Sequence, residues 1–232
     1  MLTKFSTPIN ELPSFLSTIS MVGDDQSAII QKLRDAERKS PSGYGPTRDL
    51  FLTILQGKLS FEKAMDQAWL IKDDTERKCA TQVLETSKQF LLGQHPARIA
   101  PLLGLNFSLP NGLSLAVSPV WIRQSDQTRL LVLHFWQSAF TQWQLAAAAA
   151  ILRSSLMRQK HEYASCEIDL ISVPFFELIN GRRFEIYNWA KLKPLDDTGL
   201  NRFLDRLVSA WNEYKKHSPR EVKARHSRTL FD

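Results

Sequence analysis

The sequence is poor in cysteine and glycine and has no long apolar run. Its two cysteines, Cys79 and Cys166, lie far apart, which favours a reduced cytoplasmic protein over a disulfide scaffold. None of the nine glycines belongs to a phosphate-binding loop of the dinucleotide or Walker kind, so no nucleotide cofactor is expected. The apolar run 145–152 is too short to cross a bilayer, and the N-terminus lacks the apolar block of a signal peptide. We therefore expect a cytoplasmic protein without a membrane partner.

Other familiar sites are also missing from the sequence. The five histidines and two cysteines show no paired spacing typical of a metal site, and no Gly-x-Ser-x-Gly motif marks a hydrolase nucleophile. We expect no metal and no cofactor. A hydrophobic fraction of 43% and a charged fraction of 23% are instead typical of a folded globular protein.

The positive charge of the chain is concentrated near its C-terminus. The net charge is +6, and a basic balance is compatible with a nucleic-acid partner. A solvated tail is the favoured interpretation of this segment, and a phosphate-binding arm is the alternative. The partner is therefore left open between a protein and a nucleic acid. The candidate nucleic-acid contacts are Lys215, Lys216, Arg220, Lys223, Arg225 and Arg228.

Residues 1–93 predict a helical N-terminal region. Apolar residues recur there at helical spacing in short stretches, separated by breakers such as the Ser-Pro-Ser-Gly segment at 40–43. Residues 94–216 predict an α/β core with an antiparallel meander, and residues 217–232 form the basic tail. Within the core, 94–101 is interpreted as a connector because its prolines disfavour helix.

The core contains the strongest local signal in the chain, the Asn111-Gly112 pair between two alternating stretches, which predicts a β-hairpin. We predict a meander over 103–136, whose second strand continues past Pro119 and whose third strand is 128–136. Because that third strand is apolar on both faces, we expect it at the centre of the sheet. A helix over 137–160, strands over 165–173 and 183–189, and a last helix follow. The predicted fold class is α+β, with a central mixed sheet of about five strands flanked by helices.

The predicted order of elements resembles the core of the PD-(D/E)XK restriction-endonuclease-like superfamily. That order is a helix, a three-strand meander, a helix, two strands and a helix. The resemblance covers residues 90–214 and includes Gln142-Trp143-Gln144-Leu145, which looks like the glutamine-bearing motif of some nuclease branches. The resemblance implies an Asp on the second strand and Asp/Glu-x-Lys on the third, which bind Mg²⁺ and position the attacking water.

The sequence departs from the family pattern at these positions. The second strand offers Ser118 and Pro119, and the third offers Leu133-His134-Phe135, so neither a carboxylate nor a lysine is present. If the fold is of this kind, the simplest interpretation is a degenerate core that binds a protein or nucleic acid and does not cut.

The candidate cleft residues are Ser118, His134 and Gln144, of which His134 is interpreted as a hydrogen-bonded core histidine. The alternative function is a Mg²⁺-dependent nuclease with relocated ligands, for which Glu167 and Asp169 are the candidates because they share one face of a strand. The favoured interpretation of that pair is an exposed edge-strand face.

For the Glu167 and Asp169 pair, the expected ionic partners are Arg182, Arg183 or Lys191. Phe175, Phe176 and Tyr44 are candidate exposed contacts for a partner.

Overall fold

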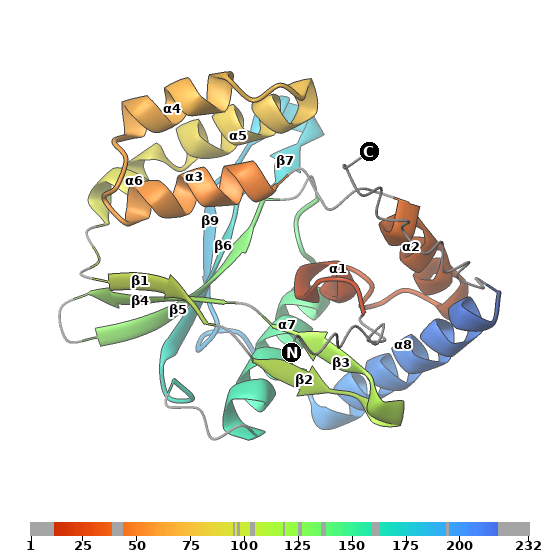
Figure 1. Cartoon of the computed structure of the whole chain (residues 1–232). Coiled ribbons are helices and arrows are strands. Elements are labelled where there is room, and N and C mark those ends of the chain that lie inside the picture. Colours follow the sequence, from red (N-terminus) through yellow and green to blue (C-terminus); the bar gives the residue numbers. More distant parts are fainter. Residues whose placement is uncertain are drawn as a thin grey trace, which may run out of the picture.

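The computed structural model describes most of the chain. The described residues are 12–38, 44–94, 96, 98–102, 105–117, 119–124, 127–135, 138–158, 163–193 and 195–217. They form an α+β fold in which a mixed five-stranded sheet has helices on both faces (Figure 1). The predicted fold class is confirmed.

The strands of the central sheet lie side by side in the order in which they occur along the chain. They are β1 (Arg98–Pro101), β4 (Val120–Gln124), β5 (Gln127–His134), β6 (Glu167–Ser172) and β9 (Glu185–Asn188). The first three form an antiparallel meander, β6 runs parallel to β5, and β9 runs antiparallel to β6. A parallel step requires a crossover, and α7 (Gln142–Arg158) supplies it.

Helices from the N-terminal region lie on opposite faces of this sheet. The upper face in Figure 1 is covered by α3 (Gly45–Leu55), α4 (Phe61–Trp69), α5 (Asp74–Thr86) and α6 (Lys88–Gly93). On the other face, α7 contacts α1 (Phe15–Ile19), while α2 (Gln26–Arg38) packs against α8 (Asp197–His217).

The alternation of side chains along β5 builds two separate cores. Leu131 and Phe135 belong to the cluster under α3 to α6, whereas Leu130 and Val132 belong to the cluster with α7 and α8. All four side chains are buried. Successive residues of a strand point to opposite faces, so this strand needs cover on both sides. The prediction that it is central and covered is correct.

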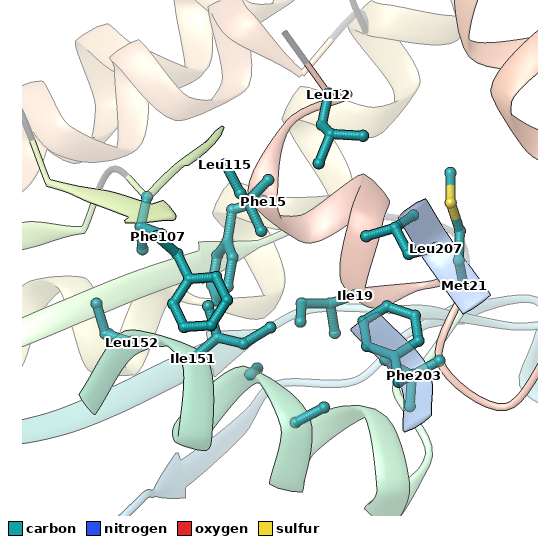
Figure 2. Packing of buried hydrophobic residues seen from close by; sticks show 14 of the residues in the cluster. Leu12, Phe15, Ile19, Met21, Phe107, Leu115, Ile151, Leu152, Phe203 and Leu207 are labelled. Atoms are coloured by element: carbon teal, nitrogen blue, oxygen red, sulfur yellow. The ribbon is translucent and has the colours of Figure 1, made fainter. Parts of the chain in front are cut away.

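The cluster around α7 draws on segments that are distant in the sequence. Figure 2 shows Phe15 and Ile19 of α1, Ile151 of α7 and Phe203 of α8 around one apolar volume. The alanines of α7 are buried here, including Ala147, and their small side chains let neighbouring elements approach the helix closely.

The Asn-Gly hairpin exists but lies outside the central sheet, so its predicted place in the meander is wrong. Its strands β2 (Asn106–Ser108) and β3 (Ser114–Ala116) pair only with each other, across a turn in which Asn111 has a φ of 62°. The hairpin instead packs Phe107 and Leu115 into the core with α7. Each such buried side chain contributes roughly 1.5–3 kcal/mol.

The first strand of the meander is β1, a segment that the sequence predicted to be a connector. Proline disfavours helix but is tolerated in an edge strand, and β1 is an edge strand that ends at Pro101. The second predicted strand is interrupted, because β3 ends at Ala116 and β4 begins at Val120.

Candidate functional site

His134 is buried at the end of β5 and is held as a neutral imidazole. Its Nδ1 lies 2.7 Å from the Ser172 hydroxyl of β6, and its ring stacks on Phe140 with the centroids 4.0 Å apart. Burial lowers the pKa of His134 to about 3, and the positive charge of Arg182 acts in the same direction. This geometry matches the interpretation of a hydrogen-bonded core histidine. Ser118, its predicted neighbour in a cleft, lies outside the described residues.

Gln144 closes the start of α7 in a capping box. The Thr141 hydroxyl accepts from the Gln144 backbone N–H at 3.3 Å, and the Gln144 side-chain oxygen accepts from the Thr141 N–H at 2.9 Å. The Gln144 Nε2 also donates to the Ser20 carbonyl at 3.0 Å, which ties the turn after α1 to α7. The helix therefore begins at Gln142 rather than 137. Sequence reasoning overlooked the Thr-x-x-Gln pattern that marks this cap.

Glu167 and Asp169 share one face of β6, as predicted, but their surroundings differ from the expectation. β6 lies inside the sheet, between β5 and β9, and Asp169 is buried. The ion-pair partner is Arg129 of β5, whose Nη2 lies 3.2 Å from Glu167 Oε2 and whose Nη1 lies 3.6 Å from Asp169 Oδ2. The expected partners Arg182 and Arg183 are wrong, because the parallel register places Arg129 directly opposite Glu167. The charge of Lys191, the third expected partner, does act on Asp169 and lowers the pKa of its carboxyl.

Both oxygens of the Asp169 carboxylate have a partner. Asn188 of β9 donates to Asp169 Oδ1 at 3.0 Å, so each carboxylate oxygen already has a partner. Burial raises the pKa of Asp169, while the charge of Arg129 and the Asn188 hydrogen bond oppose this rise. The arrangement is a cluster of two carboxylates, one guanidinium and one amide that joins three strands.

The residues present do not fit a Mg²⁺ site. In the described parts of the chain, no group of three or more His, Cys, Asp or Glu side chains could hold a metal ion. Pro119 precedes β4, so the middle of the observed second strand of the meander is the buried Ile122, while β5 carries Leu133 and His134 at its end. Hard cations require oxygen ligands, which these side chains lack.

A polar centre that sequence reasoning missed is organised by Arg182, in the short strand β8 (Gly181–Arg182). Its Nη1 donates to the carbonyls of Phe135 at 2.9 Å and Val173 at 2.6 Å, at the ends of the parallel strands β5 and β6. Its Nη2 donates to Cys79 Sγ of α5 at 3.3 Å. No local pattern marks this arginine, because its partners come from residues 79, 135 and 173.

Burial decides the protonation of the groups around Arg182. It raises the pKa of the Cys79 thiol, with Arg182 acting in the opposite direction, so the group stays a thiol at neutral pH. Burial likewise raises the pKa of Tyr44, which is half-buried beside this centre. Tyr44 is therefore not fully exposed, and its role as a partner contact stays a prediction. Phe175 and Phe176, in β7 (Phe175–Phe176), are also only half-exposed.

A hollow of about 380 Å³ lies at the outer edge of the sheet, around β1. Gln56, Lys58 and Ile99 line it from the side of α3, and Arg98 and Trp121 line it from the other side.

The exposed Arg98 of this hollow stands directly opposite the exposed Arg123 of β4 in the strand register. Among the described residues, neither arginine forms an ion pair.

The predicted basic contacts near the C-terminus fall into two groups. Lys215 and Lys216 belong to the last turn of α8, where Lys215 lies 4.7 Å from the centre of the Trp211 ring and Lys216 is exposed. The others lie outside the described residues, namely Arg220, Lys223, Arg225 and Arg228.

Comparison of the chain with protein-family models, with curated proteins and with solved structures yields no match. Within the described parts of the chain, none of the helices combines the length and the apolar character needed to span a bilayer.

Proposed function

We propose that this protein is a non-catalytic binding protein associated with nucleic acid, on a core of the restriction-endonuclease-like kind. The order of elements supports this resemblance. The main elements along the chain are the helix α6, a three-strand meander, the crossover α7, a parallel strand, an antiparallel strand and α8. The resemblance was based on this order with the meander placed at 103–136, whereas in the structure β1, β4 and β5 form the meander.

The engagement of the acidic residues carries the proposal. Asp169 is bound by Arg129 and Asn188, and Glu167 shares the same arginine. Binding a divalent cation would require breaking these contacts and leaving a half-buried guanidinium beside the metal. A binding role needs no such rearrangement. For this reason we favour binding over the alternative, a Mg²⁺-dependent nuclease that uses Glu167 and Asp169.

The distribution of positive charge favours nucleic acid over a protein as the partner. The chain has a net charge of +6, and Arg98, Arg123 and Lys216 are exposed. Lysine and arginine bind phosphate backbones by neutralising them and releasing counterions. The proposal also includes a cytoplasmic location, where Cys79 and Cys166 would remain free thiols.

The test measures binding and cleavage on the same full-length preparation. Fluorescent single-stranded and double-stranded oligonucleotides report binding by anisotropy, and plasmid with Mg²⁺ or Mn²⁺ reports cleavage. We expect binding that weakens steeply with salt, and no cleavage with either metal. Cleavage that disappears in a folded Asp169→Asn variant would overturn the non-catalytic assignment. Absence of binding to every oligonucleotide at low salt would overturn the nucleic-acid assignment.

A further inference from the structure

We infer that the outer edge of the sheet binds single-stranded nucleic acid, with backbone phosphates at Lys58, Arg98 and Arg123 and a base against Trp121. These four residues are called the edge site below. The inference rests on the proposed association with nucleic acid and adds the location and the strandedness of the ligand. The site is separate from the tail and from the strand positions of a nuclease centre.

The cross-strand arrangement of the two arginines is the first observation behind this inference. Arg98 and Arg123 are direct partners in the antiparallel register of β1 and β4, so their side chains project from the same face. Like charges directly opposite each other destabilise a strand pair. Elsewhere on this sheet Arg129 is balanced by Glu167 and Asp169, whereas the described residues offer Arg98 and Arg123 no carboxylate. An anionic ligand would relieve this repulsion.

The shape of the edge is the second observation. The hollow wraps around β1, because Ile99 packs toward α3 to α6 while Arg98, on the alternate face, shares a side with Trp121. Lys58 reaches the hollow from the turn after α3, below which β1 lies in Figure 1. The volume of about 380 Å³ falls in the usual range of small-ligand sites.

The indole of Trp121 is suited to stacking. It is half-exposed in the hollow and is braced by the ring of Tyr163, with centroids 6.2 Å apart and planes inclined by 21°. Bases of single strands stack on such aromatic platforms beside positively charged grooves. Bases of a duplex are already stacked on one another, so the indole favours a single strand.

The backbone of β1 argues against a peptide strand as the occupant of this edge. The Leu102 N–H donates to the Pro119 carbonyl at 2.8 Å, and by alternation the backbone groups of Ile99 and Pro101 point outward. Pro101 has no N–H to donate, so it interrupts the row of donors that an added strand would need. The edge is therefore unsuited to extending the sheet.

The test compares two charge-neutralised variants of the full chain with a single-stranded oligonucleotide of about 20 nucleotides. The first is the Lys58→Gln, Arg98→Gln, Arg123→Gln triple variant. The matched control is Lys63→Gln, Lys72→Gln, Lys78→Gln, which removes the same charge from exposed positions of α4, α5 and the turn between them. We expect the edge variant to flatten the slope of log K against log salt by roughly 2, from about 0.7 per lost phosphate contact. The control should leave this slope unchanged.

Two further measurements separate stacking from charge. Trp121→Leu should weaken single-strand binding roughly 5- to 150-fold, while duplex binding changes less. Because Trp121 also packs against the core, circular dichroism must first show that this variant is folded. Arg98→Glu, at an exposed position, repeats the charge test without touching the core.

The outcomes distinguish the site from the function. If the wild-type protein binds oligonucleotides and the edge variant binds equally well with the same salt slope, the edge site is refuted and the proposed function stands. If the wild-type protein binds no oligonucleotide, both are refuted. Preference for duplex over single strands would refute the assigned ligand.

Discussion

His134 makes the stability of this protein sensitive to mild acid. Its pKa is about 3 in the folded chain because of burial and the nearby Arg182 charge, whereas a histidine in an unfolded chain titrates near 6.5. The folded pKa is the lower one, so the unfolded chain binds the extra proton between these values. Stability from the neutral imidazole is thus complete above pH 6.5 and is lost as the pH falls toward 3.

The size of this loss follows from linkage. The difference of about 3.5 pKa units corresponds to roughly 5 kcal/mol over the whole window. Between pH 7 and pH 5 the histidine alone should reduce the free energy of unfolding by about 2 kcal/mol. The side chain has no exposed surface, so solvent does not screen this effect.

Urea unfolding followed by tryptophan fluorescence at pH 7, 6 and 5 measures this loss. Wild type is compared with His134→Gln, which keeps a polar partner for Ser172 but does not titrate. Contributions of carboxylates are common to both proteins and cancel in the difference. We expect wild type to lose about 2 kcal/mol more than the variant from pH 7 to pH 5. Ser172→Ala, which keeps the imidazole buried, should be less stable than wild type but equally sensitive to pH.

Parallel pH curves for wild type and His134→Gln would contradict the lowered pKa of His134 in the folded chain. They would mean that the imidazole gains a proton as easily in the folded chain as in the unfolded one. An NMR titration gives an independent check, because the ring resonances of His134 should not move between pH 7 and pH 5.

Three further predictions concern the other polar contacts. Arg182→Met removes the hydrogen-bond donors of two buried carbonyls and should lower the free energy of unfolding by about 3 kcal/mol in a urea titration. The control Arg183→Met, at an exposed neighbouring position, should change it by less than about 0.5 kcal/mol. Gln144→Ala breaks the capping box and should cost about 1–2 kcal/mol, measured by thermal unfolding. Burial raises the pKa of Asp169, and the charge of Arg129 limits this rise. Arg129→Met removes that charge, so the pKa of the Asp169 carboxyl should rise further. Because its folded pKa then lies well above its unfolded value, stability should fall as the pH rises from about 4, and carboxyl NMR should record the raised pKa.

Local patterns in the sequence predicted the elements of the fold that depend on neighbouring residues. The nearly continuous apolar run 130–135 correctly indicated a strand buried on both faces, because successive side chains of a strand point to opposite faces. The Asn111-Gly112 pair correctly indicated a hairpin turn, since its backbone favours positive φ. The Thr-x-x-Gln pattern at 141–144 is a capping box, so the start of α7 could also have been predicted from the sequence.

Local patterns did not predict which other parts of the chain these elements contact. A hairpin pattern specifies its own turn but not the surface that its apolar face will cover, so the docking of Phe107 and Leu115 against α7 was not foreseen. The pairing of Arg129 with Asp169 follows from the register of two parallel strands that are separated by a whole helix.

Local sequence patterns were sufficient to predict most of the helices and strands, though not β1, and to show that the expected strands lack carboxylates. Three contacts became visible only in the folded chain: Asp169 pairs with Arg129, Arg182 joins the ends of β5 and β6, and Arg98 faces Arg123. The two groups of features differ in the range of the interactions that determine them. Backbone propensity and side-chain periodicity act over a few neighbouring residues, whereas burial, charge pairing and hydrogen bonding depend on which distant segments the fold brings into contact.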